Sequence, residues 1–341
     1  MSSWIRRLGS KHSGFRYLGE NGRPIRDRRI LERIDLLRVP PAWKDVHVAA
    51  SPRSAIQAWG FDARGRKQYR YNGRAVERRE LRKYHRVRQL ARELPKVRRI
   101  LREDAKPNAR VQSLDVDTVA ATVLRVISET FCRVGGERYA KENGTFGITT
   151  LRKSHVELCD GTACFEYTGK GSIRQRQVVH DRELVRLVRR QLQTPGAALF
   201  RYRDARRWHV VTARDVNDYL QRRIGGYSAK DFRTWGGTLR AATVLAEIGP
   251  AKSEREAKRN VALAMRLVSS ELGNTATICR KSYVHPMVIA RYLDEGETIA
   301  LSPARRAAAN RGQAHSPEER ALIAFLDRHF PERRKVPRRE E

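Results

Sequence analysis

The sequence has few cysteines and no long apolar segment, and each shortage excludes a class of protein. Its 341 residues include four cysteines (Cys132, Cys159, Cys164 and Cys279), none at Cys-x-x-Cys spacing, so we expect reduced thiols and no metal site. No apolar run reaches the roughly 20 residues of a membrane-spanning helix. The first residues also lack the apolar core of a signal peptide. We therefore expect a soluble protein of the cytoplasm without a membrane partner.

A phosphate-binding loop is missing as well. The segment Gly169-Lys170-Gly171-Ser172 has part of that pattern, but a glycine follows the lysine and the upstream glycine is absent. We therefore expect no nucleotide and no other cofactor.

Acidic residues are scarce relative to basic ones. The chain has 71 Lys and Arg against 38 Asp and Glu, which gives a formal net charge of +33. Such an excess repels itself unless a polyanion shares the surface. Lysine and arginine gain affinity for nucleic acid by releasing condensed counterions from phosphates. The charge balance therefore predicts a nucleic-acid partner and a nucleoid-associated location.

The sequence patterns divide the chain into three parts. Residues 1–76 combine short apolar or aromatic stretches with Gly, Pro and Asn turn signals, which predicts a small β-rich domain. Residues 77–302 have mainly helical periodicity and predict the larger domain. Residues 303–341 predict a linker, a short helix that begins at Ser316-Pro317, and a basic tail.

The sequence of the larger part predicts several helices, interrupted by a short β-rich region. Helical periodicity begins at about residue 76, and Pro95 should kink or divide this helix. Residues 64–102 contain 16 Lys and Arg but only three acids, which indicates either a solvated charged face or, at least as readily, a phosphate-facing surface. Residues 115–142 should continue as helix through Arg133. Turn signals at Asp160-Gly161 and Gly169-Lys170-Gly171 predict β-hairpins. Helices should then return from residue 181 to about residue 292.

Tyr283 is a candidate nucleophile. Attack on a phosphodiester requires a nucleophile, stabilisation of a pentacoordinate phosphorus and a proton for the leaving 5′ oxygen. Without a metal ion, the stabilisation must come from arginine, lysine and amide donors. A single tyrosine is more often a packing residue, but Arg133, Lys170 and Arg233 supply the cations that this chemistry needs.

Five short motifs occur in the order and spacing of a known family. Residues 131–135 with 147–151 contain Arg133, residues 167–171 contain Lys170, residues 230–235 contain Arg233, and Leu272-Gly273-Asn274 precedes Tyr283. Residues 60–71 form the fifth motif. Together these motifs resemble the type IB DNA topoisomerases, in the branch that includes the poxvirus and bacterial enzymes. Each motif is weak alone, but five in order, over residues 38 to 292, are specific.

The resemblance implies a fold and a function. The fold would be α+β, with a small β-rich N-terminal domain that clamps DNA and a larger, mainly helical catalytic domain with a β-hairpin sheet. The enzyme would nick one strand of double-stranded DNA through a 3′-phosphotyrosyl intermediate, allow rotation and religate. It would relax positive and negative supercoils as a monomer, without ATP or metal.

The resemblance also assigns residues to roles. Tyr283 would be the nucleophile and Lys170 the acid, whereas Arg133, Arg233 and Asn274 would stabilise the phosphate. The poxvirus and eukaryotic enzymes have histidine where this chain has Asn274, so this position looks like the bacterial branch. Asparagine can donate a hydrogen bond but cannot shuttle a proton. His285 is expected to be structural. The N-terminal motif would contact DNA through six side chains: Arg66, Lys67, Gln68, Tyr69, Arg70 and Tyr71.

Two other functions remain open from the sequence. A site-specific tyrosine recombinase shares the catalytic fold, but those enzymes usually have histidine three residues before the second arginine, where this chain has Lys230. A non-enzymatic nucleoid protein would use the charge alone and would form no covalent adduct with DNA. The ordered motifs favour the topoisomerase.

Overall fold

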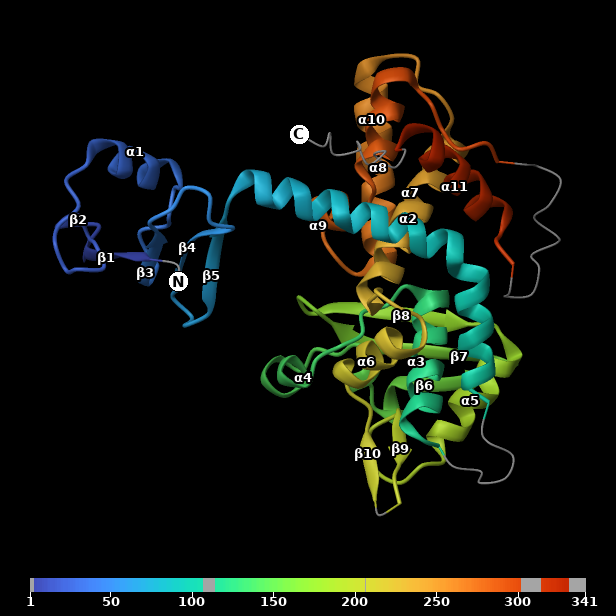
Figure 1. The fold of residues 1–341 in the computed structure, drawn as a ribbon. Helices are drawn as coiled ribbons and strands as arrows, with labels where there is room; N and C mark the ends of the chain where they lie inside the picture. The colour runs from blue at the N-terminus through green and yellow to red at the C-terminus, as the bar shows by residue number, and fades with distance from the viewer. Residues whose placement is uncertain (1–2, 107–113, 206, 302–313, 331–341) are drawn as a thin grey trace, which may run out of the picture. The chain divides into compact units, whose positions relative to one another are not determined.

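The computed structural model describes residues 3–106, 114–205, 207–301 and 314–330. The chain forms two compact units, Met1–Lys83 and Tyr84–Glu341, and helix α2 (Gly73–Asp104) passes from the first into the second (Figure 1). We describe each unit by itself. Most of the predicted linker and tail lies outside the described residues.

The first unit is an antiparallel five-stranded sheet with one helix. The strand order is β2-β1-β3-β4-β5. The strands are β1 (Trp4–Ser10), β2 (Gly14–Leu18), β3 (Lys44–Ala49), β4 (Ile56–Phe61) and β5 (Lys67–Tyr71). The sheet confirms the β-rich prediction for this part of the chain.

Helix α1 (Arg28–Leu36) was not predicted from the sequence. Asp27 caps it by accepting a hydrogen bond from the Arg29 amide. Its apolar side buries Ile34 against Val46 and Val48, and this cluster forms the core of the unit. Because side chains alternate along a strand, the opposite sheet face carries the residues between these core positions.

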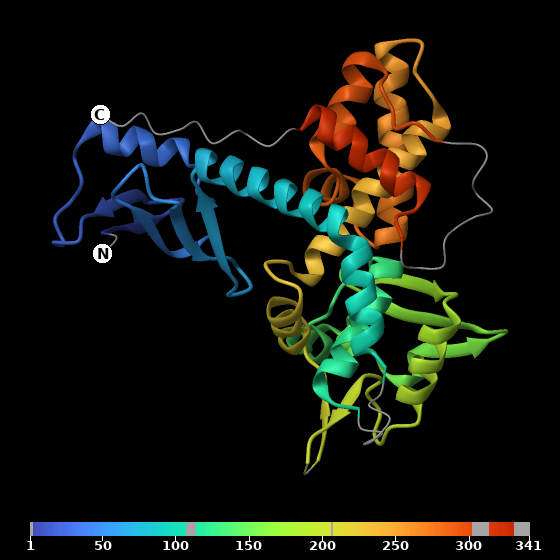
Figure 2. The ribbon, with the colours of Figure 1, turned by 45° about the vertical axis from the view of Figure 1, so that its right-hand side comes forward.

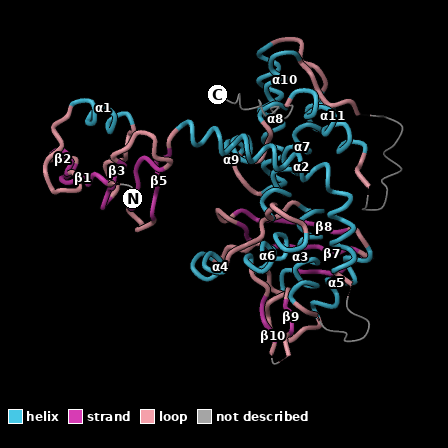
Figure 3. Tube along the Cα trace, in the orientation of Figure 1, coloured by secondary structure: helices cyan, strands magenta, loops and turns pink. Residues whose placement is uncertain are grey.

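The second unit is mainly helical, as predicted (Figure 3). After α2, its helices are α3 (Val116–Thr130), α4 (Glu137–Asn143), α5 (Arg182–Leu192), α6 (Ala213–Arg223), α7 (Ala229–Ile248), α8 (Glu254–Leu272), α9 (Ala276–Ser282), α10 (Pro286–Glu295) and α11 (Pro317–His329). Two short 3₁₀ turns, Ile148–Thr150 and Lys153–His155, precede a three-stranded antiparallel sheet. Its strands are β6 (Val156–Cys159), β7 (Thr162–Gly169) and β8 (Ile173–Val179).

Helix α3 lies at the centre of this unit. Residues 118–127 are all buried, and the helix contacts α5, α6, α7 and β8. A helix that is surrounded in this way provides a rigid base for the loop that follows it. That loop contains Arg133.

Several sequence predictions can be compared directly with these elements. Cys159 pairs with Thr162 and Gly169 with Ile173, which confirms both predicted hairpins. Ser316 caps α11 as expected. Helix α2 is not divided at Pro95, but its C-terminal part bends (Figure 2).

Two predictions for the second unit are wrong. Helix α3 ends at Thr130 because Phe131 adopts a left-handed conformation with φ of 53°, so Arg133 lies in a loop rather than a helix. The region predicted as continuous helix from residue 181 also contains a hairpin of β9 (Arg201–Arg203) and β10 (Trp208–Val210). Strands of three residues are too short to show a clear alternation of apolar and polar residues.

Candidate active site

The Arg133 loop is fixed by a second loop that lies against it. The Arg133 and Val134 carbonyls accept hydrogen bonds from the Ile148 and Thr149 amides, each at 2.8 Å. Gly147 allows this close approach, because a β carbon there would lie 2.8 Å from the Arg133 carbonyl oxygen. The second loop therefore holds the backbone that carries Arg133.

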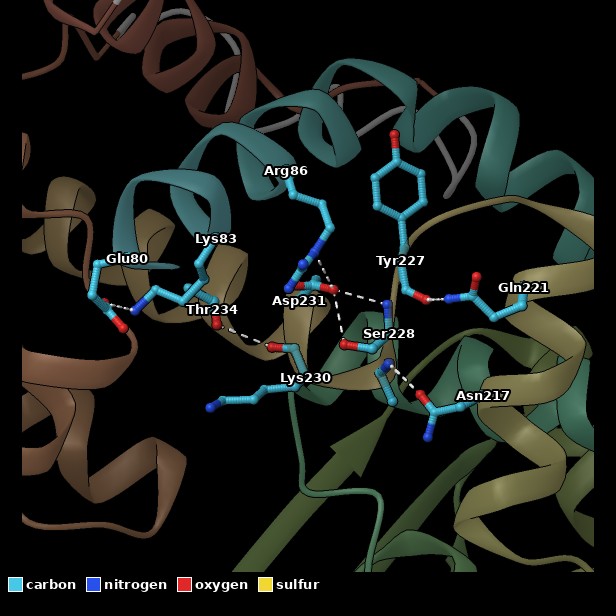
Figure 4. A network of polar contacts seen from close by, with 11 residues as sticks. Glu80, Lys83, Arg86, Asn217, Gln221, Tyr227, Ser228, Lys230, Asp231 and Thr234 are labelled. Atoms are coloured by element: carbon cyan, nitrogen blue, oxygen red, sulfur yellow. Dashed lines mark hydrogen bonds and ion pairs between the residues drawn. The ribbon is translucent and has the colours of Figure 1, made fainter. Parts of the chain in front are cut away.

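Helix α7 positions Arg233, and a polar network fixes its first turn (Figure 4). The Asp231 carboxylate accepts hydrogen bonds from the amide and hydroxyl of Ser228, both at 2.8 Å. It also forms a bidentate ion pair with Arg86 of α2, at 3.1 and 2.8 Å. Since Asp231 is buried, this ion pair is a strong constraint on where α7 begins.

Arg233 is buried and bonded to the main chain. Only 3% of its surface is exposed, and it donates to the Phe131 carbonyl at 2.8 Å and to the Leu272 carbonyl. Phe131 directly follows α3, and Leu272 is the last residue of α8. The guanidinium thus joins three helices at one point, and burial lowers its pKa from the ordinary arginine value.

Tyr283 lies at the end of α9 and faces both arginines. Its side chain is 6% exposed, and its hydroxyl accepts a hydrogen bond from Arg133 Nη1 at 3.0 Å. The Arg233 guanidinium carbon is 4.8 Å from the centre of the Tyr283 ring. Burial alone would raise the pKa of the Tyr283 phenol, but the charges and hydrogen bonds of Arg133 and Arg233 outweigh it and lower that pKa. The arrangement favours the phenolate, which is the stronger nucleophile.

The backbone after Tyr283 is also held in place. The Thr238 hydroxyl of α7 shares its proton between the Thr234 carbonyl at 2.8 Å and the Tyr283 carbonyl at 3.2 Å, and it accepts from the His285 amide at 3.1 Å. His285 is fully buried, and its Nδ1 accepts from the Met287 amide at the start of α10. These contacts hold His285 between α7 and the start of α10.

Lys170 lies in the β7–β8 turn. Gly171 and Ser172 adopt positive φ angles of 77° and 60°, which closes the hairpin. The lysine side chain is exposed, with Nζ 5.9 Å from the centre of the Tyr139 ring. It can therefore change its direction more easily than the buried Arg233 can.

Four of the five predicted catalytic residues line one pocket of about 250 Å³. They are Arg133, Lys170, Arg233 and Tyr283. Two residues that were not predicted for the site, Tyr139 and Lys230, line the same pocket. Lys230 could have been found from its spacing, because it precedes Arg233 by three residues on α7 and so shares a helix face with it.

Asn274, the fifth predicted residue, is not among those that line the pocket. It follows Gly273, which ends α8, and its amide donates to the Ser269 carbonyl at 3.0 Å. Its side-chain oxygen and nitrogen are both buried, and neither has a hydrogen-bond partner within the described part of the chain. A buried amide group without a partner is costly, so this one is available to a ligand.

The N-terminal motif presents aromatic and basic side chains on one sheet face. The Tyr69 and Tyr71 rings stack with centres 5.9 Å apart and are 40% and 39% exposed, and their spacing of two along β5 places both on the same face. The Lys67 ammonium lies 3.7 Å from the centre of the Trp59 ring. Trp59 in turn stacks on His47, with ring centres 4.0 Å apart. Trp59 and His47 extend this face beyond the predicted residues.

The other three predicted DNA-binding residues have partners inside the unit. Arg66 and Gln68 both donate to the Asp62 carboxylate, at 2.8 and 3.0 Å. Arg70 donates to the Arg38 carbonyl at 2.9 Å. All of these bonds are near the surface, so the arginine charges remain accessible.

The described residues form neither a metal-binding cluster nor a membrane-spanning helix. No group of three or more His, Cys, Asp or Glu side chains there is placed to hold a metal ion. No helix in the same residues is long and apolar enough to cross a membrane.

Comparison with known proteins identifies the class to which this site belongs. Residues 67–305 match the family model described as the catalytic core of eukaryotic DNA topoisomerase I. Because that match covers most of the chain, the protein belongs to the DNA topoisomerase I family. Residues 14–62 match the N-terminal domain of bacterial DNA topoisomerase IB, which makes the chain a type IB member with a bacterial-type first domain.

Individual relatives agree with this assignment. The chain is 31% identical over 290 residues to DNA topoisomerase 1B of Acanthamoeba polyphaga mimivirus, which covers 82% of this chain and 85% of the viral protein. It is 25% identical over 247 residues to DNA topoisomerase 1B of vaccinia virus (strain Copenhagen), at 69% and 72% coverage. These relatives favour the topoisomerase over the recombinase interpretation.

A solved structure of the XerH site-specific recombinase bound to its difH substrate also matches. The identity is 16%, the TM-score is 0.34, and the match covers 55% of this chain and 48% of the recombinase. A likeness at this level carries no argument about function.

Proposed function

We propose that this type IB topoisomerase cleaves one strand of duplex DNA with Tyr283 as the nucleophile. The observation that carries the proposal is the position of the Tyr283 hydroxyl, 3.0 Å from Arg133 and beside Arg233, in a pocket that Lys170 also lines. Two guanidinium groups there can hold a phosphate and stabilise its transition state.

The chemical step is a transesterification. The phenol loses its proton to solvent, and the phenolate oxygen attacks phosphorus while the bond to the 5′ oxygen breaks. Lys170 supplies a proton to that oxygen, so that a 5′ hydroxyl and a 3′-phosphotyrosyl ester result. The new ester conserves the energy of the phosphodiester bond. Religation is the same reaction in reverse, and neither ATP nor a metal ion takes part.

Asn274 has a separate role in this proposal. Its buried amide, which has no partner in the described residues, would donate to a nonbridging phosphate oxygen once DNA is bound. The carboxamide cannot act as an acid, which leaves proton transfer to Lys170.

Binding of double-stranded DNA would depend on the exposed cations and tyrosines of the first unit. Lys67, Tyr69 and Tyr71 share one face, and the arginines around them are accessible. The enzyme would work as a monomer on DNA in the cytoplasm, relaxing supercoils of either sign because torque drives the rotation.

Supercoiled plasmid in EDTA without ATP tests the proposal. We expect full relaxation of positively and negatively supercoiled substrates, and a covalent protein–DNA band when the reaction is stopped with detergent. Strict dependence on ATP, or loss of all activity in EDTA at constant ionic strength, would contradict the mechanism. Recombination between paired sites without relaxation would favour the recombinase alternative.

A further inference from the structure

Tyr84 of α2 contacts the peptide segment that carries the nucleophile. Its hydroxyl donates to the carbonyl oxygen of Val284, the residue after Tyr283, at 2.9 Å. Both residues are buried, with exposed fractions of 4% and 0%. A buried hydrogen bond of this kind restricts the backbone more firmly than an exposed one, because water cannot replace it.

The segment is held from a second side by α7. The Thr238 hydroxyl bonds to the carbonyl of Tyr283 and to the amide of His285. Two consecutive carbonyls, those of Tyr283 and Val284, are therefore bonded to side chains from two different helices. The Tyr84 ring also packs against His285, with ring centres 4.6 Å apart.

Helix α2 contacts α7 independently of this segment. Two residues beyond Tyr84, Arg86 forms the bidentate ion pair with Asp231 that fixes the first turn of α7 (Figure 4). The same stretch of α2 thus touches the helix of Arg233 and the segment of Tyr283. A change in either contact would alter the distance between the phenol and the guanidinium groups.

We infer that Tyr84 is a positioning residue for the nucleophile: its hydroxyl holds the Val284 carbonyl so that the Tyr283 oxygen stays within hydrogen-bond reach of Arg133. Tyr84 touches neither the phosphate nor the reacting atoms in this arrangement, and it acts through the backbone. The inference rests on the proposed role of Tyr283. The inference predicts that removal of the Tyr84 hydroxyl slows cleavage, although this hydroxyl takes no part in the chemical step.

The variant Tyr84→Phe tests the inference because it removes only the hydroxyl. Misplacing a reacting group by about 1 Å can cost on the order of 100-fold, so we expect the single-turnover cleavage rate constant to fall roughly 10- to 100-fold. The fall should be equal for a 5′-bridging oxygen and a 5′-bridging sulfur substrate, because attack rather than leaving-group departure is impaired. Affinity for the duplex should not change.

The pH profile supplies a readout that a loss of stability would not move. The charged or titratable groups that line the pocket around the Tyr283 phenol are Cys132, Arg133, Tyr139, Lys170, Lys230 and Arg233. Arginine contacts lower the pKa of the phenol in the native site. If Tyr84→Phe lets the phenol move away from Arg133, that pKa rises, and cleavage reaches its plateau at a higher pH than in the wild type.

Tyr292→Phe is the matched control. Tyr292 is also buried, and its hydroxyl donates to the Gly249 carbonyl at 2.7 Å and accepts from the Asn260 amide at 2.9 Å, so the variant likewise removes a hydroxyl–carbonyl bond. We expect it to lower thermal stability but to leave the cleavage rate constant and the pH profile unchanged. General destabilisation of either variant lowers the fraction of active enzyme, measured as reaction amplitude, and not the rate constant.

Three results have distinct meanings. An unchanged rate constant and pH profile in Tyr84→Phe would overturn the inference, whatever happens to the amplitude. Equal rate defects in Tyr84→Phe and Tyr292→Phe would also overturn it, since the effect would then be general to the fold. If Tyr283→Phe still formed the covalent adduct, the proposed function itself would fail, and that result is independent of Tyr84.

Discussion

The two units of the chain use positive charge in contrasting ways. In the first unit Lys67 is exposed over an aromatic ring, and Arg66 shares a surface carboxylate with Gln68. In the second unit Arg233 is buried, and its donors bond to two main-chain carbonyls. Exposed cations can adapt to a phosphate backbone and release its counterions. Buried cations have one geometry, which suits a transition state.

The contrast separates affinity from catalysis. Substitutions in the second unit should change rates with little effect on binding, and substitutions on the sheet face of the first unit should do the reverse. Each prediction below tests one side of this separation.

The largest effect should come from Tyr283→Phe. The variant removes the attacking oxygen and no charge, so the covalent adduct and plasmid relaxation should disappear while duplex affinity stays nearly the same. A gel assay for the adduct and a filter-binding assay measure the two quantities. An adduct in the variant would mean that another residue is the nucleophile.

Lys170→Ala should slow cleavage by roughly 10²–10⁴, the usual contribution of a general acid. The 5′ hydroxyl is a poor leaving group, whereas a 5′-bridging sulfur leaves as a thiolate and needs no proton. The variant should therefore approach wild-type rates on the sulfur substrate. An equal defect on both substrates would instead assign Lys170 to charge stabilisation.

Asn274→Ala should slow cleavage by about 10²–10³, as expected for the loss of one donor to a developing oxyanion. The defect should be the same on oxygen and sulfur substrates. Asn217→Ala is a useful control, because the Asn217 side chain already bonds to the Ala213 carbonyl and the Ala229 amide. That control should affect stability more than rate. A wild-type rate in Asn274→Ala would remove Asn274 from the site.

Arg133→Ala should shift the pH dependence of cleavage as well as lower its rate. Arg133 and Arg233 together hold the pKa of the Tyr283 phenol below its ordinary value. Removing one of these charges raises that pKa, so the phenolate forms, and cleavage reaches its plateau, at a higher pH. Single-turnover rates measured across pH at constant salt test the sign. A shift to lower pH would contradict this account of the site.

The smallest effects should come from the sheet face of the first unit. Tyr69→Ala and Tyr71→Ala should weaken binding or site preference by a few-fold without changing the fold, because both rings are exposed. Lys67→Ala should lower the slope of the logarithm of the binding constant against the logarithm of the salt concentration by about 1, which is the contribution of one phosphate contact. Arg66→Ala should reduce it by less, since Asp62 already shares its charge. Equal salt slopes for all variants and wild type would show that this face does not contact DNA.

Local patterns in the sequence predicted much of the site, and the rest depends on distant contacts. Asp160-Gly161 and the glycines around Lys170 specify hairpins by their own backbone preferences, so both turns could be predicted. The loop that carries Arg133 could not, because the apolar stripe through Phe131 looks like continuing helix. Helix α3 ends where Phe131 adopts its left-handed conformation, and residues 147–149 bond to the Arg133 loop that follows, a contact that no local pattern reveals. The bonds of Arg66 and Gln68 to Asp62 are local, four and six residues apart, but a turn signal does not specify which side chains bond across the turn.

Gly237, in the middle of α7, limits how this enzyme can be made more stable. A β carbon there would lie 2.9 Å from the Tyr283 carbonyl oxygen and 3.1 Å from the Tyr283 β carbon. Glycine inside a helix costs about 1 kcal/mol relative to alanine, so replacing it is ordinarily a simple route to thermostability. At Gly237 that route would displace the nucleophile. Gly73, the first residue of α2, has open space for a methyl group, so an engineer seeking a heat-resistant variant should begin there.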